Sequence, residues 1–166
     1  MKNTIRDLTL TGLGIALCFV ATMYLKIPNA ISGYFNMGDG IILLFSSILN
    51  PVSAFLVGGV GSAMADFVGG YPHYVIFTLL IKGFQAIVVS LLFQKFGMKV
   101  KYLAYGLGAT IMVFGYFLAK WYLKGNVYVA ISGLTSNVIQ GLAGVIVALA
   151  LLPVIYKIVM KYRNES

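Results

Sequence analysis

Charge is the scarcest property of this chain: only 10% of its 166 residues are Asp, Glu, Lys or Arg, against about 25% in soluble domains. Apolar and aromatic residues make up 60% of it, and the mean hydropathy is +0.95. A water-exposed surface with so few charges would form one continuous apolar patch, which soluble monomers do not tolerate. The composition therefore predicts an integral membrane protein, without a soluble domain in which chemistry could take place.

Residues that bind metals or act in catalysis are almost absent. The chain has one cysteine, Cys18, one histidine, His73, and four acidic residues. A single cysteine excludes an intrachain disulfide or a CxxC metal site, and a single histidine excludes a multi-histidine metal centre. No phosphate-binding loop of the GxxxxGK[ST] type is present, so we expect no ATP hydrolysis by this chain. We expect no enzymatic activity, catalytic residue, bound metal or cofactor.

The basic residues, which give a formal net charge of +8, lie near the ends of apolar runs rather than on one face. This placement argues against nucleic acid as a partner and favours topology control and attraction to anionic lipid. At one predicted end of the bundle the basic residues are few: Lys26, Lys120 and Lys124. The other end has more of them: Lys2, Arg6, Lys95, Lys99, Lys101, Lys157, Lys161 and Arg163. The positive-inside rule then predicts a multi-pass protein of the cell membrane with both termini in the cytoplasm.

Hydrophobic runs divided by Gly, Pro and Asn predict an all-α bundle of six transmembrane helices, forming a single domain over residues 1–166. The expected helices span residues 5–26, 38–50, 51–69, 73–96, 101–123 and 128–160. Asn50 is expected to cap the helix that begins at Pro51. The helix at 38–50 is too short to cross a bilayer alone, so we expect residues 31–37 to enter the protein as irregular backbone.

Lys82 lies near the middle of a predicted membrane helix, where an ionised group costs on the order of 3 kcal/mol. It follows Tyr74 by eight residues and precedes Gln85 by three, which places all three on one polar stripe. Two interpretations remain open at this point. Lys82 either forms a structural ion pair with Asp66 or Asp39 (or snorkels to the surface), or it contacts a ligand.

A second group of polar residues lies on the last two predicted helices. Asn137 and Gln140 share a helix face, and Tyr116 lies one turn before Lys120. Paired amides can read a neutral polar heterocycle, and a tyrosine ring can stack against it. The alternative is that these amides hold neighbouring helices together. We assign Tyr74, Lys82, Gln85, Tyr116, Asn137 and Gln140 to a candidate substrate site.

Several motifs resemble the substrate-binding S components of energy-coupling-factor vitamin transporters. They are Tyr34–Gly40 before an apolar run, Asn50-Pro51, Gly58–Asp66 followed by Gly69-Gly70-Tyr71, and Thr78–Gly83. Gly12 and Ala16 match the small-residue motif, commonly two alanines, with which family members dock on a shared transmembrane partner. The resemblance covers the whole chain in length and helix count and is specific from about Tyr34 to Gln85. The last two helices match no family motif.

The resemblance implies a subunit that captures a small vitamin or vitamin precursor outside the cell and delivers it inward. It also implies partners, a transmembrane coupling protein and two cytoplasmic ATPases that consume ATP. Binding is expected beneath residues 27–37 and 69–73, which adds Asn36 to the site. The closest branch is assigned to hydroxymethylpyrimidine or pyridoxine-type precursors, with pantothenate or another vitamin still open.

A self-sufficient channel or ion-coupled carrier is the alternative from another class, with Asp39, Asp66 and Lys82 forming a conduction or proton path. Four acidic residues are too few for a continuous relay, and no inverted repeat is visible. A membrane enzyme is a third alternative, but the chain lacks a nucleophile, base or metal constellation to support it.

Overall fold

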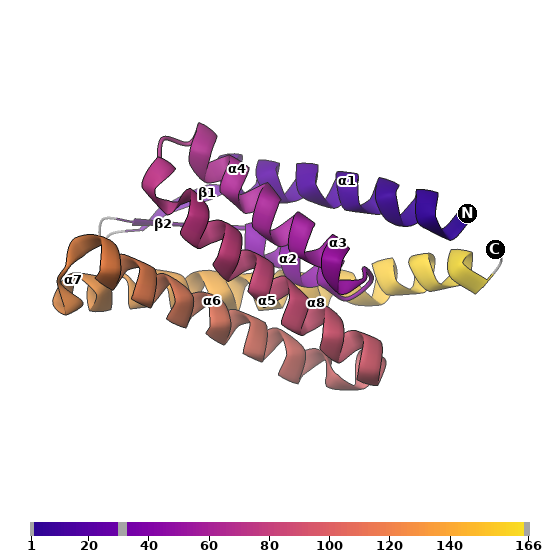
Figure 1. Ribbon diagram of the computed structural model, residues 1–166. Coiled ribbons are helices and arrows are strands. Elements are labelled where there is room, and N and C mark those ends of the chain that lie inside the picture. Colours follow the sequence, from indigo (N-terminus) through magenta and orange to yellow (C-terminus); the bar gives the residue numbers. More distant parts are fainter. Residues whose placement is uncertain (1, 30–32, 165–166) are drawn as a thin grey trace.

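The structure, a computed structural model, describes residues 2–29 and 33–164. Its helices are α1 (Lys2–Tyr24), α2 (Gly38–Ser46), α3 (Pro51–Phe55), α4 (Gly61–Val68), α5 (Val75–Phe96), α6 (Lys101–Lys124), α7 (Val127–Ser132) and α8 (Leu134–Asn164). An antiparallel hairpin, β1 (Lys26–Asn29) and β2 (Gly33–Asn36), joins α1 to α2. The hairpin and α7 lie at one end of the bundle, and the two termini and the α5–α6 connection lie at the other (Figure 1).

By length and apolar composition, four stretches within the described residues can cross a membrane: Ile5–Tyr24, Pro51–Val68, Pro72–Lys124 and Val127–Val159. The third contains both α5 and α6. The expectation of six transmembrane helices is therefore not confirmed, because α2 has only nine residues, about 14 Å of helix. The helical membrane bundle itself is confirmed.

Two local expectations are corrected. The expected helix at 128–160 is divided at Gly133 into α7 and α8. The irregular backbone expected over 31–37 is a paired strand from Gly33 to Asn36, because β1 supplies its hydrogen-bonding partner; residues 31 and 32 lie outside the described part. The capping prediction is confirmed, since Asn50 Oδ1 accepts a hydrogen bond from the backbone N–H of Ser53 at 3.0 Å.

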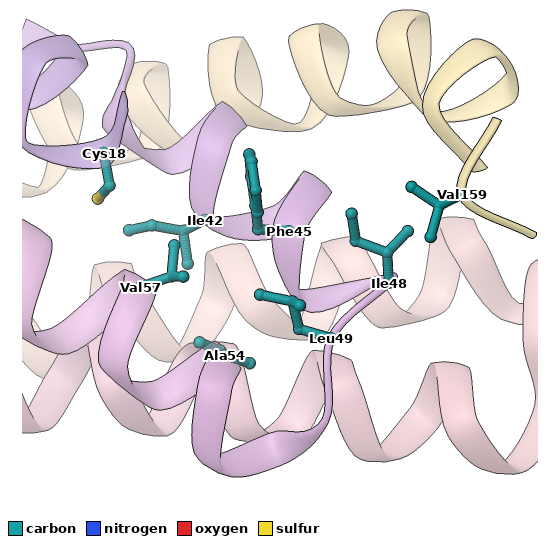
Figure 2. Packing of buried hydrophobic residues seen from close by; sticks show 9 residues of the cluster. Cys18, Ile42, Phe45, Ile48, Leu49, Ala54, Val57 and Val159 are labelled. Atoms are coloured by element: carbon teal, nitrogen blue, oxygen red, sulfur yellow. The ribbon is translucent and has the colours of Figure 1, made fainter. Parts of the chain in front are cut away.

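The short helix α2 lies at the centre of the core. Its residues from Ile42 onward are buried, and Ile42 and Phe45 join one cluster with α1, α3 and the C-terminal part of α8 (Figure 2). Leu43 and Leu44 pack in a second cluster against α5, α6 and α8. A helix that is apolar on all sides is stable only when it is enclosed, and this enclosure fixes the position of the first turn of α2.

A π-helical turn, η1 (Leu56–Val60), links α3 to α4 and lies against α5. A Cβ atom at Gly58 would lie 2.7 Å from the backbone oxygen of Lys82, and one at Gly59 would lie 2.8 Å from that of Leu79. Only glycine permits so close an approach. The two glycines therefore set the depth of α5, and with it the position of Lys82.

We predict that Gly58→Ala lowers the melting temperature of the detergent-purified chain, because its methyl group meets a backbone carbonyl and overpacking costs about 1–3 kcal/mol. Gly106→Ala is the matched control, since a Cβ there meets nothing within 4 Å and alanine favours a helix. Circular dichroism or differential scanning fluorimetry measures both. An unchanged melting temperature for Gly58→Ala would show that α5 does not depend on this contact.

Candidate functional site

A buried ion pair lies at the centre of the bundle. Lys82 Nζ donates to both carboxylate oxygens of Asp39 at 2.6 Å, and both side chains are almost completely buried. Asp39 lies in the first turn of α2 and Lys82 in the middle of α5. Of the partners proposed from the sequence, Lys82 thus pairs with Asp39, while Asp66 accepts a hydrogen bond from Thr78.

Two amides complete the surroundings of the Asp39 carboxylate. Gln85 Nε2 donates to Oδ1 at 3.0 Å, and Gln140 Nε2 donates to Oδ2 at 2.6 Å. A carboxylate has about four acceptor positions, and all are used here. A buried charge is stable only when it is paired and hydrogen-bonded in this way. The Asp39 network therefore joins α2, α5 and α8 at one point.

Gln140 extends this network to the hairpin. Its Oε1 accepts hydrogen bonds from the backbone N–H and the side-chain amide of Asn36, at 3.3 and 3.4 Å. Asn36 Oδ1 in turn accepts from the backbone N–H of Gly38 at 3.0 Å. The Gln140 amide is thus bonded largely to protein atoms, and it links the end of β2 to the ion pair.

Above the network, at the hairpin end, lies a polar cavity of about 280 Å³. Five of the seven predicted substrate residues line it: Asn36, Tyr74, Tyr116, Asn137 and Gln140. Lys82 and Gln85 are not among the lining residues, because both side chains are directed to Asp39; the Lys82 ammonium also lies 5.4 Å from the centre of the Tyr116 ring. Ligand contact by any of the seven stays a prediction.

The other lining residues are Thr22, Asp66, Tyr71, Thr78, Lys120, Ser132, Gly133 and Ser136. Helical spacing indicates two of them, since Thr78 is one turn from Lys82 and Lys120 is one turn from Tyr116. No sequence pattern indicates Thr22, which reaches the cavity only through the packing of α1, whereas Tyr71 belongs to the 69–73 segment that the family resemblance places over the site.

One wall carries a directed chain of hydroxyl groups. Thr78 Oγ1 donates to Asp66 Oδ2, so it must accept from the Tyr116 hydroxyl, 2.9 Å away. A threonine hydroxyl has a single proton, which fixes this direction. The chain delivers its hydrogen bonds to the Asp66 carboxylate, which makes this wall the acceptor side of the cavity.

Other lining residues of the cavity offer unused polar groups. A Cβ at Gly133 would lie 2.9 Å from Lys120 Nζ, so the ammonium rests against the α7–α8 junction. Within the described residues the side chains of Lys120 and Asn137 have no hydrogen-bonding or ionic partner, and the buried Thr22 hydroxyl has no hydrogen-bond partner either. Of these three groups the Thr22 hydroxyl is buried, and buried polar groups normally find partners. The Lys120 and Asn137 side chains are partly exposed and line the same cavity, so the three groups together indicate a place for a polar ligand.

An apolar helix bundle with one polar cavity near its end is the architecture of a membrane protein that binds a small solute. The sequence profile described as "ECF-type riboflavin transporter, S component" matches residues 2–157, so the chain belongs to this family. It is accordingly a multi-pass membrane protein and a transporter component, not an enzyme.

Three curated relatives match the chain, and the first of them is described as a transporter. The "Thiamine precursor transporter HmpT" of Lactococcus lactis subsp. cremoris is 29% identical over 156 residues, 93% of this chain and 90% of that protein. An "Uncharacterized protein in gap 3'region" of Pyrococcus woesei is 36% identical over 131 residues, 77% of this chain and 86% of that protein. A "UPF0397 protein" of Lactiplantibacillus plantarum is 36% identical over 68 residues, 40% of this chain and 37% of that protein.

We predict that Lys82→Met lowers the melting temperature strongly, because it leaves the Asp39 charge buried and unpaired, at a cost of about 3–5 kcal/mol. Lys95→Met is the matched control: the same substitution in the same helix, at an exposed position. The double variant Asp39→Asn/Lys82→Met should recover part of the loss, because no charge remains buried. Equal melting temperatures for Lys82→Met and Lys95→Met would contradict the role given to the pair.

Proposed function

We propose that this chain is the substrate-binding subunit of an ATP-driven importer, and that it captures a small vitamin precursor in the cavity at the hairpin end. The observation that carries the proposal is the set of unused polar groups around that cavity, on Thr22, Lys120 and Asn137. The buried Thr22 hydroxyl is costly without a partner in an apolar bundle, and the partly exposed Lys120 and Asn137 side chains line the same cavity. A bound polar molecule would supply the missing hydrogen bonds.

The size of the cavity favours a single heterocyclic ring. Its 280 Å³ is near the lower limit of ligand pockets, which is about 300 Å³. The description of the family profile names riboflavin, a tricyclic molecule with a sugar-alcohol chain. The description of the Lactococcus relative names a thiamine precursor instead. We propose the second class, a substituted pyrimidine such as hydroxymethylpyrimidine, with a pyridoxine-like ring as the next candidate.

The Asp66 side of the cavity and the unused polar groups of its lining suggest how such a ring is held. Its amino group would donate towards Asp66, while ring nitrogens or hydroxyl groups would accept from Lys120 and Asn137. The rings of Tyr74 and Tyr116 offer faces for stacking. In this arrangement Asn137 contacts the ligand directly. Asn36, Gln85 and Gln140 hold the cavity floor through Asp39, and Lys82 neutralises the charge beneath it.

The energy for transport would come from partners, a transmembrane coupling protein and two cytoplasmic ATPases that consume ATP. Gly12 and Ala16 lie on the exposed side of α1, opposite the face that packs on α4, and a Cβ at Gly12 meets nothing within 4 Å. This open, small-residue surface suits the close approach of a partner helix. We propose it as the docking site of the coupling protein.

In the proposed orientation both termini lie in the cytoplasm and the cavity faces outward. The larger group of basic residues then lies on the cytoplasmic side, as the positive-inside rule requires. The hairpin and α2 together would make one crossing of the bilayer, alongside α1, α3–α4, α5, α6 and α8, which gives the six-membered bundle.

We predict that the purified chain, without ATP or partners, binds one hydroxymethylpyrimidine per molecule in isothermal titration calorimetry and binds riboflavin much more weakly. Asn137→Ala should weaken binding by roughly tenfold or more, because a lost hydrogen bond to a buried group costs about 1–3 kcal/mol. Asn126→Ala is the control; Asn126 caps α7 and does not line the cavity.

Tight riboflavin binding would overturn the substrate class, and a folded chain that binds neither compound nor a pyridoxine-type ring would overturn the proposed function. Liposomes separate the proposal from a self-sufficient carrier. Uptake into liposomes that contain this chain alone would favour the self-sufficient carrier. Uptake that requires the added ATPase complex would exclude the self-sufficient carrier.

For the docking surface, we predict that Ala16→Leu abolishes co-purification with the coupling complex and transport but leaves vitamin affinity unchanged, because leucine fills the space that close helix approach needs. Ala150→Leu, on the exposed side of α8, adds the same bulk elsewhere and should preserve assembly. Reduced vitamin affinity in an intact complex would refute this assignment of α1.

A further inference from the structure

An apolar groove of about 670 Å³ runs between α6 and α8, on a face of the bundle that the vitamin cavity does not use. Glycines at 106 and 141 contribute to its lining, and Phe114 and Leu142 flank it. The one hydroxyl among its aliphatic residues, that of Thr110, donates to the Gly106 carbonyl at 2.9 Å. That hydroxyl is therefore already hydrogen-bonded within α6, and the groove offers hydrocarbon contact to a ligand.

The length of the groove fits a lipid chain. It extends along α6 from Tyr102 to Phe117, fifteen residue steps, which is about 22 Å of helix. One leaflet of the hydrocarbon core is about 15 Å thick, half of the ~30 Å total. The groove is therefore long enough to hold one acyl chain of a single leaflet along α6.

The end of the groove at Tyr102 is strongly basic. The Lys101 ammonium lies 5.0 Å from the centre of the Tyr102 ring, and Lys95 and Lys99 are in or beside the same α5–α6 connection. The sequence has no acidic residue from Phe67 to Asn164. None of these lysines has a carboxylate partner in the described part of the chain. The charge at this end calls for an anion.

We propose that the α6–α8 groove binds one acyl chain of an anionic phospholipid, whose phosphate pairs with Lys101. Basic sites between transmembrane helices select anionic headgroups in this way, and hydrocarbon in the groove adds apolar contact. A second copy of the chain fits less well, because each copy has a net charge of +8 and would bring a like-charged lysine cluster to the contact. This inference does not depend on which vitamin the cavity binds.

The test uses the full chain in a neutral detergent, titrated with dioleoylphosphatidylglycerol or with dioleoylphosphatidylcholine, which has the same tails without net charge. Melting temperature and native mass spectrometry are the two readouts. We expect phosphatidylglycerol to raise the melting temperature by about 4 °C and to give a one-lipid adduct, because a ligand of the folded state stabilises it. Phosphatidylcholine should act much more weakly.

Two variants and two controls assign the site. Gly106→Leu should remove the adduct by filling the groove, whereas Leu107→Phe adds bulk one position outside the lining. Lys101→Gln should weaken phosphatidylglycerol binding about fivefold, whereas Lys124→Gln, at the opposite end of α6, should not. Circular dichroism of each variant reports whether it is folded.

Three outcomes would overturn the proposal. The first is an equal response of the unmodified chain to the two lipids. The second is an adduct that survives both Gly106→Leu and Lys101→Gln in folded protein. The third is a dimer that increases with protein concentration and is lost in Gly106→Leu, which would make a second copy the occupant.

Discussion

The ion pair between Asp39 and Lys82 is the constraint on which the rest of the structure depends. Two charges inside an apolar bundle are stable only if the surrounding helices bring every hydrogen-bonding partner into place. Gln85 of α5 and Gln140 of α8 meet this demand, and Gln140 passes the constraint on to Asn36 at the end of the hairpin. The enclosure of α2 and the close approach of α5 at the η1 glycines bring Asp39 and Lys82 together, and the network then holds the hairpin against α8.

The pair also divides the polar residues into two groups with different tasks. Below, the network saturates the Asp39 carboxylate and links α2, α5 and α8 under the cavity, although the buried Gln85 Oε1 has no hydrogen-bond partner among the described residues. Above, the unused groups of Lys120, Asn137 and Thr22 line a cavity of about 280 Å³, which is the proposed vitamin-precursor site. Such a separation lets the floor stay fixed while a ligand enters and leaves, because ligand binding need not break the costly buried contacts.

Much of this could be predicted from the sequence, and the reasons for success and failure are specific. Long apolar runs ended by Gly, Pro and Asn predict the helices to within a few residues, and a capping Asn predicts the start of α3. The break at Gly133 was missed because glycine alone is a weak signal inside an apolar run. Lys82 was recognised as costly, but spacing along one helix cannot say which carboxylate it meets, since Asp39 lies 43 residues away. Thr22 reaches the cavity through tertiary packing, which leaves no periodic trace.

The most direct test of the central claim is an experimental structure of the chain with a thiamine precursor bound. The account predicts the ring in the cavity at the hairpin end, bonded to Asn137 and Lys120, with the Lys82 ammonium still on both oxygens of Asp39. A ligand that displaces Lys82 from Asp39, or that binds away from this cavity, would contradict it.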